Sequence, residues 1–274
     1  MRDYFGADAA ELKNKKLWLF DMDGTIYQED RLFEGTLDLL AWIRNQGGRY
    51  VFISNNSSRS VEEYVEKVHR MGIPADRDSF FISTQAAALY LRTRHPGARV
   101  YVQATRSCVA ELREEGIDVT EEVDPSAQVV LVGFDMELTM EKLRRTCIML
   151  GYENTFLATN PDLVCPVSFG YVPDCGSMCQ SLYNATKRRP RFLGKPEPTM
   201  IDIVREKYHV PAEETVVLGD RLYTDIAAGL AAKVSAVCVL SGECTLEDIA
   251  RGPEVPSWTF GSVADIYAGL VSEA

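Results

Sequence analysis

Short apolar runs alternate with amphipathic helical patterns along most of the chain. Leu17–Phe20 has the length and composition of a buried strand, and apolar residues recur at helical spacing after Thr36, which is expected to cap that helix. Tyr50–Ile53 predicts a second strand, and Ser60 and Glu63 have the spacing of a capping box at the start of the next helix. Strands that alternate with helices predict parallel sheets covered by helices on both faces.

The same alternation continues through the middle and the C-terminal part of the chain. Further strands are expected at Phe80–Ser83, Val100–Gln103, Val129–Gly133, Phe156–Ala158, Arg191–Leu193, Thr215–Leu218 and Val234–Leu240. Helical patterns lie near Gln85–Arg94, Ser107–Glu115 and Glu141–Leu150. Between residues 84 and 189 no strand ends in a cluster of acidic or small polar residues of the kind seen elsewhere. We therefore predict an α/β core domain, residues 1–83 and 190–274, with an α/β domain inserted at residues 84–189.

Composition and charge exclude several classes of protein. The 274 residues include 29 Lys and Arg against 40 Asp and Glu, a net charge of −11 that would repel a nucleic-acid backbone. No apolar stretch approaches the roughly 18 residues of a membrane span, and the first residues show no secretory pattern, so we expect a cytoplasmic location. The seven cysteines include no C-x-x-C pair and are expected to be reduced thiols.

Acidic residues follow two of the predicted strands. Asp21 and Asp23 come directly after the first strand, and Asp220 and Asp225 follow the strand at Thr215–Leu218. Ligands of open parallel sheets bind at the carboxyl ends of strands, so these side chains should converge. Two carboxylates about 4 Å apart repel by about 4 kcal/mol at an effective dielectric near 20. A hard divalent cation with oxygen ligands resolves this repulsion, and Mg²⁺ suits a site that also holds a phosphate.

One cation and one polar loop complete the candidate site. Lys195 stands between Gly194 and Pro196, so its backbone is kept out of the helical region. The segment Ser54-Asn55-Asn56 offers a hydroxyl and backbone N–H groups at the end of a strand, where proteins often bind phosphate oxygens. Acids, a lysine, a hydroxyl and a metal together are typical of phosphoryl transfer.

These motifs, in this order, resemble the four motifs of the haloacid dehalogenase (HAD) superfamily. They are Asp21-x-Asp23-Gly24-Thr25, Ser54-Asn55-Asn56, Gly194-Lys195-Pro196 and Gly219-Asp220-x-x-x-Thr224-Asp225. The inserted domain is similar to the α/β cap of subfamily IIA, which comprises the NagD-like and p-nitrophenyl-phosphatase-like proteins. The stretches Ala158–Asp162 and Pro173–Ser177 also resemble that subgroup. The resemblance implies a Rossmann-like HAD core with a parallel sheet, and a cap that closes over the site.

The resemblance also implies a role for each motif residue. Asp21 would be the nucleophile that forms an aspartyl-phosphate, and Asp23 the general acid and then the base that activates water. Ser54, Asn55 and Lys195 would bind the phosphoryl group. The Asp21 carboxylate, the Asp23 backbone carbonyl and Asp220 would bind Mg²⁺, with Asp225 in support.

The expected function is therefore Mg²⁺-dependent hydrolysis of a small phosphate monoester, of the sugar phosphate or nucleoside monophosphate class. A phosphomutase on the same core and a non-catalytic module that binds a phosphorylated ligand are the alternatives. Asp23 argues against a dehalogenase, because superfamily dehalogenases lack an acid at this position. No nucleic acid or membrane partner is expected, although the cap could form a homodimer.

Several residues have a second interpretation in the sequence. Asp225 could instead act at the start of a helix, where the helix dipole favours an acid. Asn160, Asp162, Cys175 and Ser177 are candidates for substrate contact in the cap, although a turn and helix packing also explain them. Glu243 follows Ser241-Gly242 where the family usually has a small or apolar residue, and an extra carboxylate there could alter selectivity.

Overall fold

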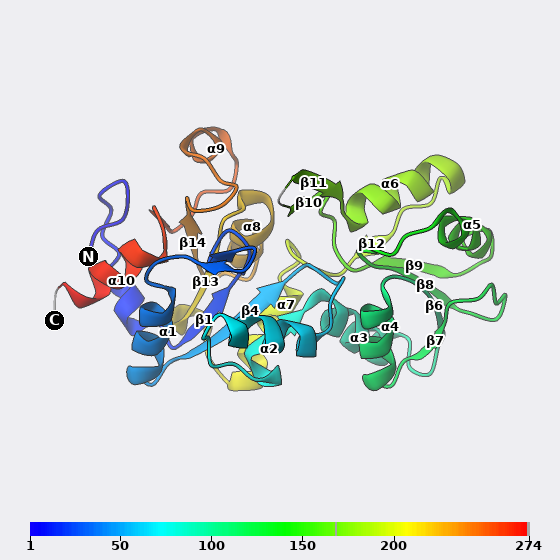
Figure 1. The fold of residues 1–274 in the computed structure, drawn as a ribbon, viewed down its shortest axis with the longest axis horizontal. Helices are drawn as coiled ribbons and strands as arrows, with labels where there is room; N and C mark the ends of the chain where they lie inside the picture. Colours follow the sequence, from blue (N-terminus) through cyan, green and yellow to red (C-terminus); the bar gives the residue numbers. More distant parts are fainter. Residues whose placement is uncertain (168, 273–274) are drawn as a thin grey trace. The chain divides into compact units, whose positions relative to one another are not determined.

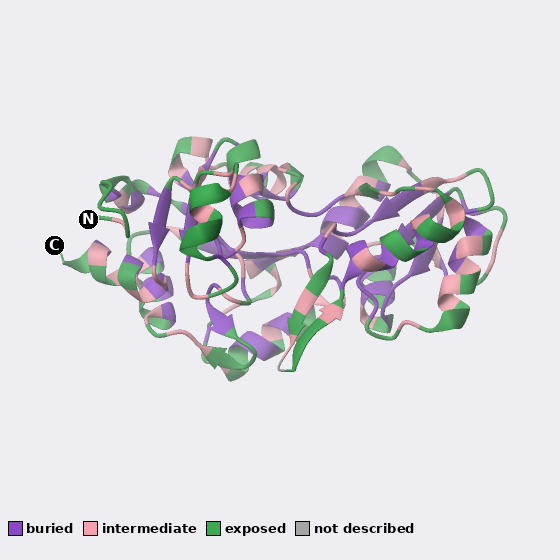
Figure 2. Ribbon diagram, turned by 90° about the horizontal axis from the view of Figure 1, so that it is seen from above, coloured by how far each residue is buried: buried purple, intermediate pink, exposed green. Residues whose placement is uncertain are grey.

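A computed structural model describes residues 1–167 and 169–272, and its contacts fall into two compact units. The core unit comprises Met1–Ile53, Val65–Phe81 and Lys195–Ala274, and the cap unit comprises Ser54–Tyr64 and Ile82–Gly194. Each unit is built around a sheet whose strands are mostly buried, as the purple arrows of Figure 2 show. The predicted α/β class, with parallel sheets and covering helices, is confirmed (Figure 1).

The core sheet has six strands in the order β15-β14-β13-β1-β4-β5. Strand β1 pairs in parallel with β13 and β4, and β14 pairs in parallel with β13 and β15. The strands span Leu17–Phe20 (β1), Arg49–Ser54 (β4), Phe80–Ile82 (β5), Thr215–Gly219 (β13), Ser235–Val239 (β14) and Trp258–Phe260 (β15). Because β1 is central, the residues that follow it lie at the middle of the carboxyl edge of the sheet.

Helices and short elements complete the part of the chain around the core sheet. The helices are α1 (Thr36–Asn45), α2 (Val61–Arg70), α7 (Thr199–Tyr208), α8 (Ala227–Ala231), α9 (Leu246–Arg251) and α10 (Val263–Val271). A two-stranded antiparallel pair joins β2 (Tyr27–Gln28) to β3 (Arg31–Leu32). Alternate residues of β1 face opposite sides, as a strand requires. Leu17 and Leu19 pack with residues of α7 and α8, and Trp18 packs edge-on against Trp42 of α1.

The start of α1 differs from the expectation. Gly35, with a φ of +76°, is the residue that precedes the helix, and Thr36 is its first helical residue rather than its cap. The Thr36 hydroxyl donates instead to the Ile26 carbonyl at 2.9 Å. A Cβ at Gly35 would lie 2.6 Å from the Ala264 Cα, so this turn needs a glycine for both conformation and space. The capping box at Ser60 and Glu63 is confirmed.

The cap unit has a parallel sheet in the order β12-β9-β8-β6-β7. The strands span Arg99–Gln103 (β6), Asp118–Thr120 (β7), Val129–Val132 (β8), Thr155–Ala158 (β9) and Arg191–Phe192 (β12), and a separate hairpin joins β10 (Val164–Val167) to β11 (Gly170–Pro173). The helices are α3 (Ser83–Arg94), α4 (Arg106–Glu114), α5 (Met140–Met149) and α6 (Cys175–Thr186). The strand expected at Phe80–Ser83 ends at Ile82, because Ser83 begins α3.

Strand β8 shows why both faces of the cap sheet need helices. Val129 and Leu131 face the cluster formed with α3 and α4, whereas Val130 and Val132 face the cluster formed with α5 and α6. A strand buried on both faces reads as a continuous apolar run, which is the pattern of Val129–Val132.

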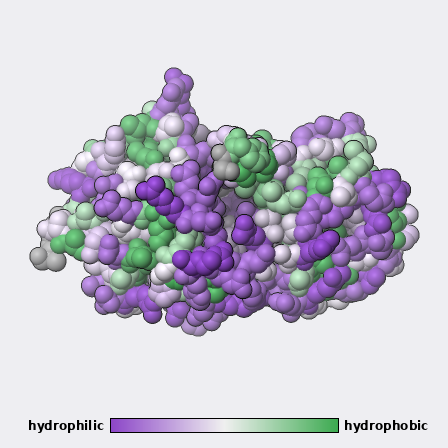
Figure 3. Space-filling view, viewed as in Figure 1, coloured by the Kyte–Doolittle hydropathy of each residue, from purple (hydrophilic) through white to green (hydrophobic). Residues whose placement is uncertain are grey.

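The face shown in Figure 3 is mostly hydrophilic, with small hydrophobic patches between the charged regions. Among the described residues, no helix has the length and hydropathy that crossing a bilayer requires.

The first residues of the chain bind the edge of the core sheet, a role that the sequence alone did not assign. Asp3 Oδ1 accepts hydrogen bonds from the Phe5 and Ala7 N–H groups, and Asp3 Oδ2 accepts one from the Thr259 N–H of edge strand β15 at 3.1 Å. The Tyr4 N–H donates to the Thr259 carbonyl at 2.7 Å. This segment therefore pairs part of a strand edge that would otherwise be exposed.

Replacement of Asp3 by Ala is expected to destabilise the protein by about 1–3 kcal/mol, because the buried Thr259 N–H would lose its acceptor. Urea unfolding followed by circular dichroism measures the change. Asp30→Ala, at an exposed position, is the control and should leave the free energy of unfolding within about 0.5 kcal/mol of wild type. Equal stability of the two variants would contradict the role given to Asp3.

Candidate active site

The centre of the site is a lysine ammonium held between two carboxylates. Lys195 Nζ lies 2.6 Å from Asp21 Oδ1 and 2.5 Å from Asp225 Oδ1, and it also donates to the Ile53 carbonyl at 3.2 Å. Its side chain is only 2% exposed. Burial alone would lower the pKa of Lys195, but the charges of Asp21 and Asp225 outweigh that effect and raise it, so the lysine is cationic.

Asp21 and Asp220 reach this place as the carboxyl-edge rule predicts. Asp21 follows β1 and its N–H donates to the Leu218 carbonyl of β13 at 2.8 Å, while Asp220 follows β13 itself. Lys195 arrives differently, because it follows β12, a strand that pairs with β9 in the sheet of the cap unit. The carboxyl-edge rule therefore accounts for the positions of Asp21 and Asp220, but not for the position of Lys195.

Asp225 reaches the cluster through a π-helical turn. Leu222–Ile226 forms this turn, and the N–H of Ile226 donates to the Arg221 carbonyl five residues earlier. The turn directs the Asp225 side chain back over the end of β13, where a Cβ on Gly219 would lie only 2.2 Å from the Asp225 Cβ. Such wide turns often occur at functional sites. Asp225 is 1% exposed and also lies in the first turn of this helical segment, so its supporting role at the site stays a prediction.

Three carboxylates of this site meet the requirements of a hard divalent cation. One ligand atom from each of Asp21, Asp220 and Asp225 lies within 4.8 Å of the others. Asp220 Oδ1 is buried and accepts no hydrogen bond from the residues that the structure describes. A buried carboxylate oxygen without a donor is costly, and a cation would satisfy it. The residues present therefore fit a divalent metal.

The same crowding raises the pKa of two of these acids. Burial, followed by the charges of Asp21 and Asp225, raises the pKa of Asp220 to about 7. Burial also raises the pKa of Asp225 to about 6, although the positive charge of Lys195 opposes this shift. Both shifts reflect burial and mutual repulsion of the acids, which a bound cation would relieve.

Asp23 has a different environment from the three clustered acids. Its side chain is exposed at the surface of the core unit, yet partial desolvation by the surrounding protein raises its pKa, and the charge of Asp21 adds to this effect. Lys67 of α2 opposes the shift, and its ammonium lies 3.9 Å from the centre of the Tyr27 ring. A raised pKa favours the protonated form that a general acid needs. Sequence reasoning missed Lys67, although a lysine three residues after Tyr64 interrupts the apolar face of the predicted helix.

Ser54 and Asn55 belong to the cap unit, and they form hydrogen bonds with other residues of that unit. Ser54, the last residue of β4, accepts a hydrogen bond at its Oγ from the Asn56 N–H at 3.2 Å. Asn55 Nδ2 donates to Asp162 Oδ2 at 3.0 Å, and the Asn55 carbonyl accepts from the Ser83 hydroxyl at 2.6 Å. The Asn55 amide therefore binds another residue of the cap unit. Phosphate binding by Ser54 and Asn55 stays a prediction.

The four cap candidates form hydrogen bonds within the cap unit. Asn160 Nδ2 donates to Asp162 Oδ2 at 3.2 Å and to Asp174 Oδ1 at 3.0 Å. Cys175 is buried at the start of α6, and the Ser177 hydroxyl donates to the Leu163 carbonyl at 2.6 Å. These bonds hold the turn after β9 against the start of α6, so a structural role is shown for these residues and a substrate contact stays a prediction.

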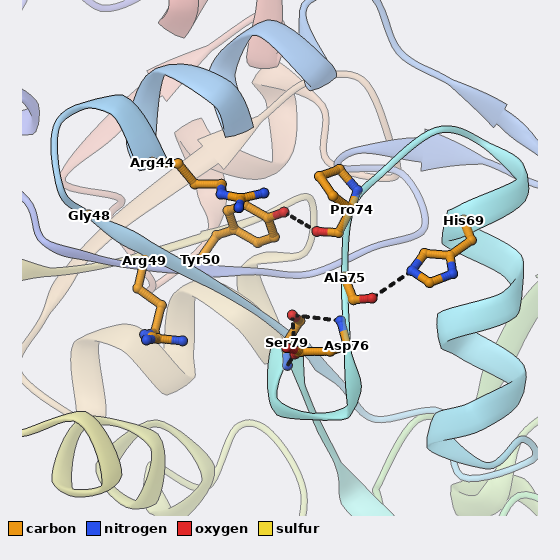
Figure 4. Close-up of a pocket in the computed structure, with 9 residues that line it drawn as sticks. All are labelled: Arg44, Gly48, Arg49, Tyr50, His69, Pro74, Ala75, Asp76 and Ser79. Carbon is orange, nitrogen blue, oxygen red and sulfur yellow. Dashed lines mark hydrogen bonds between the residues drawn. The ribbon is translucent and has the colours of Figure 1, made fainter.

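A separate cavity of about 460 Å³ lies at the start of β4, at the opposite end of that strand from Ser54. Arg44, Arg49, Tyr50 and His69 line it, and Figure 4 shows the Tyr50 hydroxyl bonded to the Pro74 carbonyl and the His69 ring to that of Ala75. Its side chains thus support the local backbone and lie outside the acidic cluster.

Comparisons with known proteins agree with this geometry. Residues 18–118 match the family of haloacid dehalogenase-like hydrolases, and residues 192–266 match a HAD-hydrolase-like family. The ribonucleotide monophosphatase NagD of Escherichia coli K12 is 31% identical over 90% of this chain and 96% of its own length. The acid sugar phosphatase of Staphylococcus saprophyticus is 29% identical over 94% of this chain and 99% of its own. The crystal structure of a 4-nitrophenylphosphatase from Thermotoga maritima superposes with a TM-score of 0.89 at 34% identity, and covers 95% of this chain and 99% of that one.

The chain therefore belongs to the haloacid dehalogenase superfamily, among its phosphoric monoester hydrolases. Within that class it is a NagD-like phosphatase of subfamily IIA.

The raised pKa values predict how the stability of metal-free protein depends on pH. Between the ordinary carboxyl pKa near 4 and the folded value of about 7, the folded state binds more protons than the unfolded state, so stability falls as the pH rises. In excess chelator we expect the melting temperature to be higher at pH 5 than at pH 8, and Asp220→Asn to reduce this difference.

Asp78 is the matched control, because a hydrogen bond from Lys207 lowers the pKa of its exposed carboxyl. Its contribution has the opposite sign and is lost as the pH falls, so Asp78→Asn should not reduce the stabilisation at pH 5. Thermal unfolding of the three proteins at both pH values measures these effects. An unchanged pH dependence in Asp220→Asn would contradict the shifted pKa.

Proposed function

We propose that this phosphatase hydrolyses a small phosphate monoester through an aspartyl-phosphate intermediate and depends on Mg²⁺. The observation that carries the proposal is the Asp21 carboxylate, which Lys195 holds at 2.6 Å inside a cluster of buried acids. The salt bridge to Lys195 fixes the position of this carboxylate, as attack by a nucleophile requires. Asp23, two residues later, has a raised pKa and suits proton transfer.

The proposed reaction has two steps. In the first, an oxygen of Asp21 forms a bond to phosphorus while the bond to the leaving oxygen breaks, and Asp23 donates its proton to that oxygen. In the second, water attacks the phosphorus of the aspartyl-phosphate, and Asp23 takes a proton from the water. Inorganic phosphate leaves, and the Asp21 carboxylate and the Asp23 proton are restored.

Lys195 has two functions in this scheme. Its ammonium donates hydrogen bonds to Asp21, Asp225 and the Ile53 carbonyl, so it orients the nucleophile before substrate binds. By resemblance, Lys195 and the Ser54 hydroxyl also hold the phosphoryl oxygens, which requires Lys195 to share one of these bonds with the substrate. The developing charge of the transition state would strengthen that contact.

Asp21 and Asp220, with the backbone carbonyl of Asp23, would hold Mg²⁺, and Asp225 would support them. When bound, Mg²⁺ supplies positive charge that offsets the phosphate dianion and the acids around it. The substrate classes we propose are sugar phosphates and nucleoside monophosphates, because relatives similar over nearly the whole chain are named for sugar and ribonucleotide phosphatase activity.

Release of inorganic phosphate from a panel of monoesters tests the proposal. Wild type should release phosphate with Mg²⁺ and lose this activity in excess chelator, while Asp21→Asn should be inactive because an amide cannot form the aspartyl-phosphate. Asp30→Asn, an exposed change of the same type, should keep the wild-type rate. Hydrolysis by a folded Asp21→Asn protein would refute the covalent mechanism, and an isomerised sugar phosphate without free phosphate would indicate a phosphomutase.

The role of Asp23 predicts a dependence on the leaving group. p-Nitrophenolate leaves without protonation far more readily than a sugar alkoxide does. Asp23→Asn should therefore lower the rate of aspartyl-phosphate formation from a sugar phosphate by about 10²–10⁴-fold. The rate of the same step with p-nitrophenyl phosphate should fall much less. Burst kinetics with both esters measures that first step. An equal loss for the two esters would exclude Asp23 as the general acid.

A further inference from the structure

The loop after β14 packs directly against Asp220. A Cβ on Gly242 would lie 2.0 Å from Asp220 Oδ2, so the backbone approaches the carboxylate as closely as a glycine allows. The Glu243 N–H donates to Asp220 Oδ2 at 2.8 Å, and the Cys244 N–H donates to the Asp220 carbonyl at 2.9 Å. One oxygen of Asp220 is thus oriented by this loop, and Oδ1 stays available to a cation.

The side chain of Glu243 fastens this loop to the residues that follow Asp220. Its Oε2 lies 2.9 Å from Arg221 Nε, and its Oε1 accepts a hydrogen bond from the Tyr223 hydroxyl at 2.9 Å. The side chain of Arg221 is largely buried, at 16% exposed, whereas that of Glu243 is 35% exposed and lies at the surface. Ion pairs with both oxygens of the acid engaged are geometrically specific.

These contacts close a ring around Asp220. The chain runs from Asp220 to Arg221, the ion pair links Arg221 to Glu243, and the Glu243 N–H returns to the Asp220 carboxylate. We propose that Glu243 is a positioning residue, whose pairing with Arg221 and Tyr223 fixes the loop so that Asp220 is oriented to bind the divalent cation. The inference rests on the proposed function, in which Asp220 is a metal ligand.

Loss of the Glu243 carboxylate would weaken cation binding in two ways. The loop would lose the anchor that aims its N–H at Asp220, and Glu243 would no longer offset the positive charge of Arg221 beside the cluster. Both effects act against the cation, and neither removes the loop. The Ser241 hydroxyl still donates to the Gly24 carbonyl at 2.7 Å, and the Cys244 N–H still donates to Asp220, so the fold should survive.

A substrate contact is the competing role for Glu243. Asp220, Arg221, Tyr223 and Glu243 line a cavity of about 350 Å³ in the core unit, so a ligand could reach this carboxylate. Such a role predicts a higher KM for particular esters with unchanged metal affinity. A positioning role predicts weaker metal binding by the protein, whichever ester is used as substrate. It also predicts a kcat that recovers at high Mg²⁺ for all esters.

The test is calorimetric titration of chelator-treated protein with Mg²⁺ and with Mn²⁺, alongside kcat and KM at increasing Mg²⁺. Glu243→Ala should weaken metal binding roughly tenfold, as loss of a group that orients a ligand typically does, while the melting temperature of metal-free protein stays near wild type. Glu243→Gln, which keeps an acceptor for Tyr223, should show a smaller loss and guards against misfolding of the alanine variant. Glu247→Ala removes an exposed ion pair with Arg251 of the neighbouring α9 and should bind metal as wild type does.

Asp220→Asn separates the failure of this inference from failure of the proposed function. If Asp220→Asn weakens metal binding and Glu243→Ala does not, the positioning role is overturned and the metal site stands. If Glu243→Ala changes only KM, the residue contacts substrate and the positioning role is again overturned. If Asp220→Asn binds metal as wild type does, the metal assignment fails and the role of Glu243 fails with it.

Discussion

The core of the site depends on the pairing of one buried lysine with two carboxylates. Lys195 is 2% exposed, and a buried ammonium is tolerated only where anionic partners satisfy it. Asp21 and Asp225 are those partners, and each in turn needs the lysine because Asp220 adds a third acid to the cluster. The glycines at 24, 219 and 242 follow from the same constraint, since a Cβ at each would meet a carboxylate of Asp220 or Asp225 within 2.3 Å.

The sequence predicts most of the fold and the acids of the site, because these follow from local rules. Alternating apolar runs and helical patterns indicate parallel strands, and residues after neighbouring parallel strands meet at one edge, which is how Asp21 and Asp220 come together. Lys195 could not be placed in this way, since its strand pairs within the other sheet, and only the motif around it indicated its role. The wide turn that directs Asp225 inward is equally hidden, because its residues have the spacing of an ordinary helix start.

Hydrogen bonds and ion pairs between side chains that are distant in the sequence cannot be predicted from the sequence pattern. The amide of Asn55 binds Asp162, which lies 107 residues away, and the Arg221 guanidinium pairs with Glu243. Glu243 was recognisable in the sequence as an unusual carboxylate, but its direction depends on a rotamer and on the path of a loop. The same residue type can recognise substrate or organise a backbone, and the sequence pattern alone does not distinguish these two roles.

The charge balance of the site explains why metal and substrate binding should depend on each other in the proposed reaction. Asp21, Asp220 and Asp225 outnumber the lysine at the centre of the cluster, so each of these acids that is ionised repels a phosphate dianion there. A divalent cation reverses that balance and favours the dianion, while the bound dianion adds ligand oxygens and charge that favour the cation. Binding free energies are reciprocal, so each should increase the affinity for the other by the same factor. The acids that repel one another in the metal-free protein thereby make substrate binding conditional on the cation.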